Sequence, residues 1–292
     1  MLRSLLPEYT TVFAQNYDSA FLFYPFTQPH GSSRAGLGLF SKYPVSSALR
    51  RSFPISTSFS KFFDLDRCYS VSRIPVDNGK ELVIFNLHMS AYGNSDAIRQ
   101  GQIEMLCNDM AKEYEAGNYV LCGGDFNHDL KASEEDTESC ESWAFPFPRT
   151  ELPEHFAFCL DLLSSEEQAA LWNSARNADM EYVPGVTYTV TLDGFIISDN
   201  IECLSYENVN TGYSYSDHDP VKIEFVLFLM LSSSGLTMFI PKFLQIEMDT
   251  YIPNGDIHGI VILTLIAAVI VVYAVVSLRI KVTLTTQVGQ DI

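Results

Sequence analysis

Basic residues are scarce in this sequence. Eighteen Lys and Arg stand against 36 Asp and Glu, which gives a formal net charge of −18. Proteins that bind nucleic acid electrostatically neutralise its phosphates with clustered Lys and Arg. The shortage of positive charge therefore argues against a protein that holds a polyanion on a basic surface.

Closely spaced cysteines are also lacking. The six cysteines contain no Cys-x-x-Cys pair, and they stand at Cys68, Cys107, Cys122, Cys140, Cys159 and Cys203. Small secreted domains that depend on disulfides have a short-spaced cysteine framework. We therefore expect free thiols, and the cysteines leave the redox compartment open.

Several common enzyme motifs are missing. The sequence has no G-x-S-x-G, no Walker loop and no G-x-G-x-x-G. Acyl transfer, nucleotide-triphosphate and Rossmann interpretations therefore have no support. General disorder is excluded as well, because 47% of the residues are hydrophobic and long apolar runs occur.

One long apolar run lies near the C-terminus. Residues 260–278 are uncharged, and as a helix they would be about 28 Å long, close to the hydrocarbon thickness of a bilayer. We expect a single-pass transmembrane helix here, with a buried helix or two core strands as the alternative. Arg279 and Lys281 follow the run, which predicts an extracytoplasmic catalytic domain. The first residues of the chain do not look like an export signal, so the topology stays open.

The rest of the chain divides into a globular domain, residues 1–228, a membrane-proximal linker, residues 229–259, and a short tail, residues 279–292. Short apolar or alternating runs separated by turn residues predict strands at 37–40, 68–76, 82–87, 119–122, 186–190, 194–197 and 220–227. Asn78-Gly79 predicts a hairpin, and one helix is expected from near Ser95 to about Glu115. Many strands with few helices favour packed sheets with helices outside.

Four strand-like runs adjoin polar residues that can bind metal or phosphate. These residues are His88; Asp125 and Asn127; Asp193; and Asp217 and His218. Each segment alone also fits an ordinary turn or a structural histidine. Strand ends that recur in this way are how a scaffold gathers a site from distant sequence, and the four together predict one site.

These side chains suit hydrolysis of a phosphate ester. Carboxylates such as Asp125 and Asp217 hold a hard divalent cation, Mg²⁺ or Mn²⁺, through oxygen, and the cation neutralises phosphoryl charge and positions water. Asp193 beside His218 would hold the imidazole in one tautomer and favour its charged form. His88 and Asn127 can donate hydrogen bonds to phosphoryl oxygens.

In this order the motifs resemble the endonuclease/exonuclease/phosphatase superfamily, the fold of pancreatic deoxyribonuclease. The resemblance covers residues 10–228 and rests on segments 36–45, 86–88, 124–127, 192–193 and 216–221. It implies a four-layer α/β/β/α sandwich, in which two mainly antiparallel sheets pack together and helices flank them. It also implies phosphoester hydrolysis that depends on a divalent metal.

The resemblance also implies a role for each residue. Asp125 would orient or deprotonate the attacking water, and Asn127 would contact phosphate. Asp217 would bind metal, and His218 paired with Asp193 would act as acid/base or phosphate stabiliser. His88 would be the second catalytic histidine. The predicted catalytic residues are thus His88, Asp125, Asn127, Asp193 and His218, and the predicted metal ligands are Asp125, Asn127 and Asp217.

The chain departs from the family pattern at its N-terminus. Members begin with a strand that bears an Asn and a strand that bears the principal metal-binding Glu, and neither is found here. Leu5, Leu6, Tyr9 and Val12 stand at helical spacing, which predicts that the chain opens in the helix after that Glu. We therefore expect a fold that is incomplete at the N-terminus, an N-terminally truncated reading of a longer gene. A catalytically impaired member that acts at most as a binding protein is the alternative.

The acidic stretch 134–141 is expected to be a solvated loop. A cation-binding protein built around this stretch is a third hypothesis. The residues leave the substrate open between a small phosphoester, a lipid headgroup and nucleic acid, and they imply no protein partner. The net charge favours a small or membrane-presented phosphoester over a long polyanion.

Overall fold

The computed structural model of the chain describes residues 2–18, 34–54, 66–90, 96–133, 144–228 and 282–286, and residues 20, 21, 23, 26, 27, 29, 31 and 32. The chain forms two compact units. The first contains residues 1–199, 203–224 and 283–292, and the second contains residues 200–202 and 225–282. Every residue of the predicted site belongs to the first unit.

The described helices are α1 (Leu2–Leu5), α2 (Asp96–Glu115) and α3 (Ser165–Ala170), with 3-10 turns at η3 (Arg149–Glu151) and η4 (Cys159–Leu162). The strands are β1 (Thr10–Asp18), β2 (Arg34–Ser41), β3 (Ser47–Ser52), β4 (Cys68–Pro75), β5 (Glu81–His88), β6 (Tyr119–Asp125), β7 (Phe156–Phe158), β8 (Ala175–Arg176), β9 (Thr189–Val190), β10 (Asp193–Ser198), β11 (Ile201–Asn208), β12 (Val221–Leu227) and β13 (Val282–Thr286).

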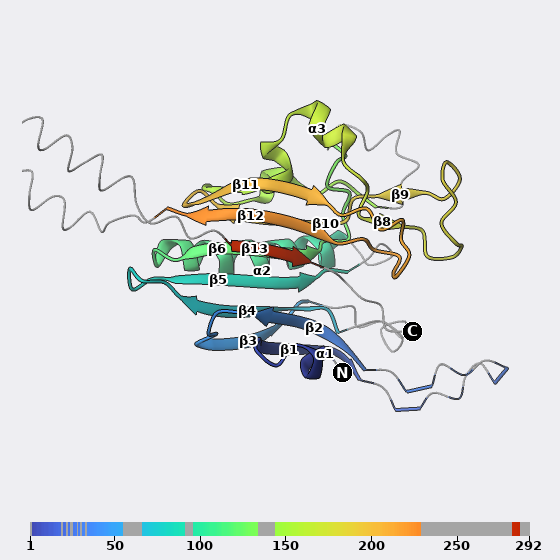
Figure 1. The fold of residues 1–292 in the computed structure, drawn as a ribbon, viewed down its shortest axis with the longest axis horizontal. Helices are drawn as coiled ribbons and strands as arrows, with labels where there is room; N and C mark the ends of the chain where they lie inside the picture. Colours follow the sequence, from blue (N-terminus) through green and yellow to red (C-terminus); the bar gives the residue numbers. More distant parts are fainter. Residues whose placement is uncertain are drawn as a thin grey trace, which may run out of the picture. The chain divides into compact units, whose positions relative to one another are not determined.

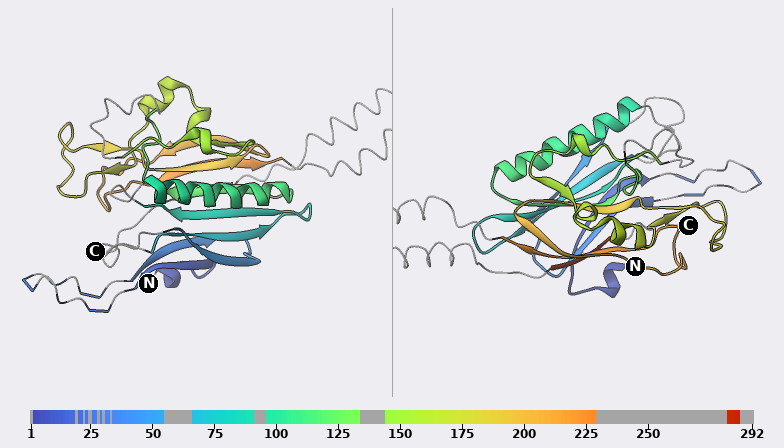
Figure 2. Two further views of the ribbon diagram at one scale, coloured as in Figure 1. Left: turned by 180° about the vertical axis from the view of Figure 1, so that it is seen from behind. Right: turned by 90° about the horizontal axis from the view of Figure 1, so that it is seen from above.

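A central sheet of six strands organises the first unit (Figure 1). Its strand order is β3-β4-β5-β6-β10-β7. Strands β5 and β6 are parallel, whereas the other neighbouring pairs are antiparallel. A parallel pair needs a crossover, and α2 supplies it by lying along one face of the sheet (Figure 2). The predicted mixed α/β class is confirmed.

Helix α2 is anchored by one apolar face. Ile103, Leu106 and Met110 are fully buried, as their spacing predicts. Gly117 ends the helical segment with a φ of +82°, a left-handed conformation that glycine adopts without steric cost. Burial of this face fixes α2 against the sheet, and therefore fixes where β6 begins.

Three smaller sheets complete the described structure. Strands β1 and β2 form an antiparallel pair, β8 pairs with β9, and β11, β12 and β13 hydrogen-bond in that order. The Asn78-Gly79 hairpin joins β4 to β5 as predicted, with Gly79 at a φ of +76°. The five described cysteines are free thiols, in agreement with their wide spacing.

Two predictions of local structure are wrong. The helical spacing of Leu5, Leu6, Tyr9 and Val12 extended the first helix too far, since α1 ends at Leu5 and residues 10–18 are strand β1. The run of β-branched and aromatic residues after Glu8 favours a strand, which pairs with β2 along its whole length. The predicted strand 186–190 shrinks to Thr189–Val190, because a turn forms before it and the N–H of residue 186 donates to the Val183 carbonyl.

Some predictions lie outside the described residues. These are the linker 229–259, the transmembrane helix 260–278 and the acidic loop 134–141. Within the described ranges, no helix is both long and apolar enough to cross a membrane. The span at 260–278 and the single-pass membrane localisation therefore stay predictions, whereas the predicted tail 279–292 contains β13, which hydrogen-bonds to β12.

Candidate active site

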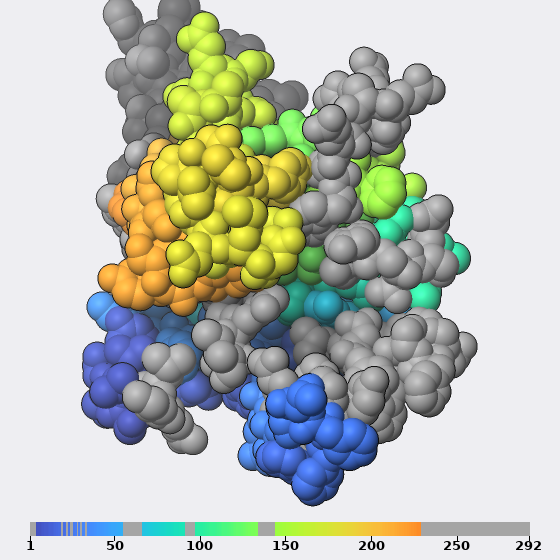
Figure 3. Space-filling view, turned by 90° about the vertical axis from the view of Figure 1, so that its right-hand side faces the viewer, coloured from blue at the N-terminus to red at the C-terminus, as the bar shows by residue number. Residues whose placement is uncertain are grey.

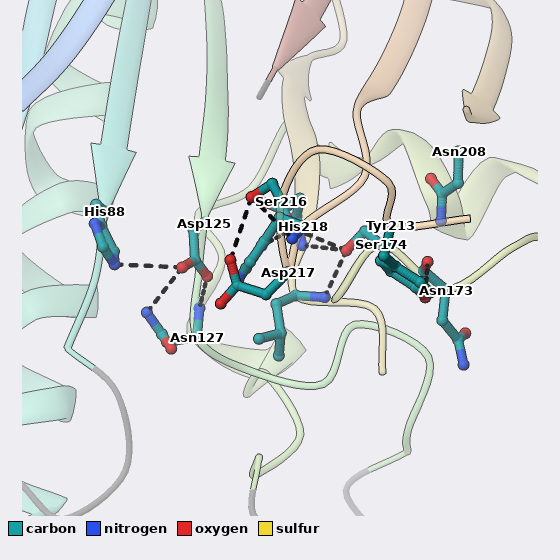
Figure 4. Close-up of polar contacts among 12 residues, drawn as sticks. His88, Asp125, Asn127, Asn173, Ser174, Asn208, Tyr213, Ser216, Asp217 and His218 are labelled. Carbon is teal, nitrogen blue, oxygen red and sulfur yellow. Dashed lines mark hydrogen bonds and ion pairs between the residues drawn. The ribbon is translucent and has the colours of Figure 1, made fainter. Parts of the chain in front are cut away.

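The sheet register brings the ends of four neighbouring strands into one row, and three of these strands carry predicted site residues. Cys68 of β4 pairs with His88 of β5, His88 pairs with Asp125 of β6, and Asp125 pairs with Asp193 of β10. Directly paired residues on adjacent strands lie about 5 Å apart, so residues far apart in sequence meet at one end of the sheet. Figure 4 shows His88 and Asp125 there, with His218 entering from the loop before β12.

Gly124, immediately before Asp125 in β6, is a position that only glycine can occupy. A Cβ at this position would lie 2.1 Å from the Leu87 carbonyl oxygen, and the residue has a φ of +142°. Only glycine fits both conditions. The close approach of β6 to β5 at this point holds Asp125 beside His88.

Asp125 is buried and surrounded by hydrogen-bond donors. Its Oδ1 accepts the backbone N–H of Asn127 at 2.8 Å, and its Oδ2 accepts the Nδ2 of Asn127 at 3.1 Å. Burial, with a further contribution from the charge of Asp193, raises the pKa of Asp125 to about 7, although His218 opposes the shift. Asp125 is therefore poised to exchange a proton near neutral pH.

Asn127 is held in a strained conformation by the same contacts. Its φ is +51°, in the left-handed region. One Nδ2 proton serves Asp125, and Nδ2 also donates to the Met89 carbonyl at 2.9 Å. Both amide protons are thus committed, so the predicted contact with phosphate requires Asn127 to give up one of these bonds.

His88 contacts Asp125 and Arg67, a residue that the motifs did not reveal. The Nε2 of His88 lies 3.3 Å from Asp125 Oδ2, and Nη1 of the buried Arg67 donates a hydrogen bond to the same Nε2. Because an arginine can only donate, Nε2 is the acceptor and the ring proton is on Nδ1. Burial, and then the positive charges of Arg67 and His218, lower the pKa of His88 well below its usual value. The contact with Asp125 is therefore not an ion pair.

His218 has the opposite character, because a carboxylate holds it. Its Nδ1 lies 2.7 Å from Asp193 Oδ2, and Ser174 Oγ donates to the same oxygen at 2.8 Å. Burial alone would lower the pKa of His218, but Asp193, with Asp125 and Asp217, raises it to about 10. His218 is therefore an imidazolium at neutral pH, with Nε2–H left for a substrate oxygen.

The remaining residues of the Ser216–Pro220 motif have separate tasks. Asp217 is half-buried, and the Ser216 hydroxyl donates to its Oδ1 at 3.2 Å. Asp219 is buried and accepts from Trp172 Nε1 at 2.8 Å and from the Thr211 hydroxyl, among others. Asp219 therefore holds the loop in place, and Asp217 is the carboxylate that remains available.

The described residues offer few side chains that could bind a metal ion. Among the residues that the structure describes, no group of three or more His, Cys, Asp and Glu could hold a metal ion. Asp125 already accepts hydrogen bonds on both oxygens, and only Asp217 adds a second accessible carboxylate. The described residues therefore do not by themselves fit a protein-built Mg²⁺ or Mn²⁺ site.

Comparison with protein families identifies the fold. The model of the Endonuclease/Exonuclease/phosphatase family matches residues 4–163, more than half of the chain. The chain belongs to the Endonuclease/Exonuclease/phosphatase family. The match includes β5 and β6 with His88, Asp125 and Asn127, whereas Asp193, Asp217 and His218 lie beyond it.

Solved structures of low sequence identity share this family fold. The human Nocturnin catalytic domain with bound sulfate anion is 17% identical, with a TM-score of 0.51, and 78% of this chain and 76% of that chain are covered. ANGEL2, a 2',3'-cyclic phosphatase, is 11% identical, with a TM-score of 0.50 and coverage of 77% and 75%. At these identities the likeness concerns the fold. No curated protein sequence matches the chain.

Proposed function

We propose that the chain hydrolyses phosphoester bonds at the strand ends that carry His88, Asp125 and Asp193, where His218 enters from the loop before β12. The observation that carries the proposal is the geometry at one end of the sheet, where buried Asp125 pairs with Asp193 across the strands and Asp193 Oδ2 lies 2.7 Å from Nδ1 of the buried His218. Asp125 has a pKa raised to about 7, and His218 has a pKa raised to about 10. One accepts a proton and the other donates one near neutral pH.

In the proposed reaction, Asp125 takes a proton from water as the water oxygen forms a bond to phosphorus. The bond between phosphorus and the leaving oxygen breaks, and His218 gives its Nε2 proton to that oxygen. Asp193 is a positioning residue, because it would act through His218, whose Nδ1 lies 2.7 Å from Asp193 Oδ2. Arg67, which donates to His88, supplies positive charge beside the place where phosphoryl charge develops.

Magnesium or manganese held by Asp125, Asn127 and Asp217 stays a prediction from the sequence, because the described residues do not by themselves fit such a site. When bound, such a cation would neutralise phosphoryl charge. Family membership supports this expectation and also the four-layer sandwich of two packed sheets, and both stay proposals. No step above is routed through a metal.

The test is hydrolysis of bis-p-nitrophenyl phosphate and p-nitrophenyl phosphate by the full chain, with Mg²⁺, with Mn²⁺ and with EDTA. We expect His218→Asn to lower kcat/KM by about 100-fold or more, as the loss of a general acid does. A comparison of the two substrates also separates diesterase from monoesterase activity.

A second histidine–aspartate pair gives a matched control. His155 Nδ1 lies 2.7 Å from Asp199 Oδ2, the same distance as in the site, but this pair is exposed and lies past the opposite end of β10. His155→Asn should leave activity unchanged, and Asn tolerates the positive φ of residue 155. Full activity in His218→Asn, or equal losses in both variants, would refute the proposed roles.

The alternative function is that of a catalytically impaired member that only binds a phosphoester. The missing third metal ligand among the described residues favours it. A folded chain that binds p-nitrophenyl phosphate without turnover under any of the three cation conditions would decide for this alternative. Turnover that depends on His218 would decide against it.

A further inference from the structure

Large apolar side chains are exposed on three loops of the first unit. Phe23 and Phe26 on the β1–β2 connection are 68% and 84% exposed, Val186 on the β8–β9 connection is 68% exposed, and Tyr215 is 85% exposed. We define the apolar rim as Phe21, Phe23, Phe26, Val183, Val186 and Tyr215, all of which are exposed. Single exposed apolar residues are ordinary, but six on three loops beside one site are not.

Two of these loops are tied directly to the candidate active site. Tyr215 comes immediately before the Ser216-Asp217-His218 segment. Strand β8 begins one residue after Ser174, which bonds Asp193, and its Ala175 forms a β-bridge with His218. The β8–β9 loop with Val183 and Val186 therefore extends outward from the residues that hold the catalytic imidazole.

The third loop, the β1–β2 connection, begins close to Arg67. The Asn16 carbonyl near the end of β1 accepts the N–H of Asp66, the neighbour of Arg67, at 2.7 Å. Among the described residues of the β1–β2 connection, the rings of Phe21 and Phe23 pack edge to face, with their centroids 4.8 Å apart. Figures 1 and 2 show the hairpin tip and the β8–β9 loop projecting from the same end of the first unit, where β5 also ends. Figure 3 views this end directly, with the blue hairpin below the yellow loop.

The position and charge of the rim restrict what it can contact. A surface that covers the mouth of the site must carry the phosphoester that the site receives. Nucleic acid is disfavoured by the net charge of −18, and the β8–β9 loop adds the exposed acids Asp179 and Glu181. Exposed phenylalanine and tyrosine on loop tips are the side chains that insert at the boundary between lipid headgroups and acyl chains.

We propose that the apolar rim docks on a zwitterionic phospholipid bilayer, and that the site receives a phosphodiester headgroup presented by that surface. This inference rests on the proposed phosphoester hydrolysis. In the bound arrangement, the rim phenylalanines enter the headgroup boundary while His218 and Asp125 face the phosphate layer. The acidic residues near the rim make an anionic bilayer a poorer surface than phosphatidylcholine.

The docking test places a fluorescent probe on the rim of the full chain. Phe26→Trp is reconstituted with phosphatidylcholine vesicles, with and without brominated acyl chains, and the emission of the parent chain is subtracted. We expect a blue shift and at least about twofold quenching of the added indole by the brominated lipid. The matched control is Tyr43→Trp, an exposed aromatic position past the opposite end of β2, which should show neither.

The substrate test compares two phosphoesters with one variant. The triple variant Phe21→Ser, Phe23→Ser and Phe26→Ser should lose about tenfold or more in hydrolysis of phosphatidylcholine headgroups in vesicles. Its hydrolysis of soluble bis-p-nitrophenyl phosphate should be unchanged, because these residues lie outside the catalytic row.

The outcomes separate the two proposals. No quenching of the Phe26→Trp indole, or equal quenching in Tyr43→Trp, overturns bilayer docking and leaves soluble hydrolysis standing. Cleavage of the soluble diester without cleavage of phosphatidylcholine overturns the lipid substrate. Absence of any hydrolysis refutes the proposed function, while quenching still reports docking. Stronger quenching in phosphatidylserine vesicles than in phosphatidylcholine vesicles overturns the zwitterionic surface.

Discussion

At the scale of single residues, the two site histidines differ because of their neighbours. His88 is buried against the guanidinium of Arg67, which disfavours a second positive charge, whereas His218 is buried against Asp193, which favours one. Burial lowers the pKa of both rings. The sign of the nearest charge therefore decides which histidine is neutral and which is an imidazolium.

The residue scale yields a prediction for the pH–rate profile. Activity should rise as the pH passes about 7, because Asp125 must lose a proton, and fall as the pH passes about 10, because His218 must keep one. The rising and falling limbs of the profile report Asp125 and His218 together, because the two charges interact. Asp193→Asn removes the negative charge that holds the imidazolium, so the upper limb should move down by about one pH unit or more. A profile of kcat/KM against pH on a soluble phosphoester measures this shift.

Ser174→Ala is the control for that prediction. It removes a hydrogen bond to the same Asp193 oxygen but leaves the carboxylate charge in place. The upper limb should then stay near its original position. An upper limb that does not move in Asp193→Asn would show that another group sets it.

At the scale of elements, the ends of β5, β6 and β10 define the site through their register. The β4–β5 register can be counted from the sequence, because Cys68 and His88 stand equally far from Asn78 in the hairpin turn. Counting outward from this turn pairs His88 with Cys68 and places Arg67 one residue further along, so the count alone does not reveal its contact with His88. Ser174 had no comparable signal, since it lies in a loop whose position depends on β8 and β9.

For the elements, we expect Gly124→Ala to destabilise the sheet. The added Cβ would overlap the Leu87 carbonyl, so β5 and β6 must separate at the site. We expect a loss of about 3 kcal/mol in the free energy of unfolding, together with loss of activity. Urea unfolding followed by tryptophan fluorescence gives the measurement.

Gly79→Ala provides the comparison, because Gly79 also has a positive φ but its Cβ would meet no atom within 4 Å. This variant should lose only about 1 kcal/mol and keep its activity. Equal losses in the two variants would mean that the backbone angle, and not the contact with β5, accounts for the need for glycine at residue 124.

At the scale of the whole molecule, the acidic surplus has two parts. Asp125 and Asp193 lie in the row of the candidate site, and Asp219 is buried among hydrogen bonds that hold a loop. Exposed acids such as Asp179 and Glu181 contribute to the net charge of the surface. The whole-molecule charge therefore acts chiefly on the choice of partner, by repelling polyanions and anionic surfaces.

The whole-molecule prediction concerns residues 260–278, which we expect to span the membrane. Ala267→Arg with Ala268→Arg places two charges in the middle of this run, where each costs about 3 kcal/mol in a bilayer. The variant should move from the carbonate-resistant membrane fraction to the soluble or aggregated fraction. The matched pair Gln287→Arg with Gln290→Arg, in the tail, should stay in the membrane. Release of the unchanged chain by carbonate would contradict the span.

The sequence by itself determined the family, and it predicted the residues that the sheet register brings to one end of the sheet, because strand ends with polar residues and the hairpin turn are local patterns. It also predicted α2, whose burial follows from helical spacing. Only the tertiary structure decided that residues 10–18 form a strand, that Arg67 and Ser174 join the site, and that both amide protons of Asn127 are committed. These features depend on pairing and burial between distant segments, which no local pattern records.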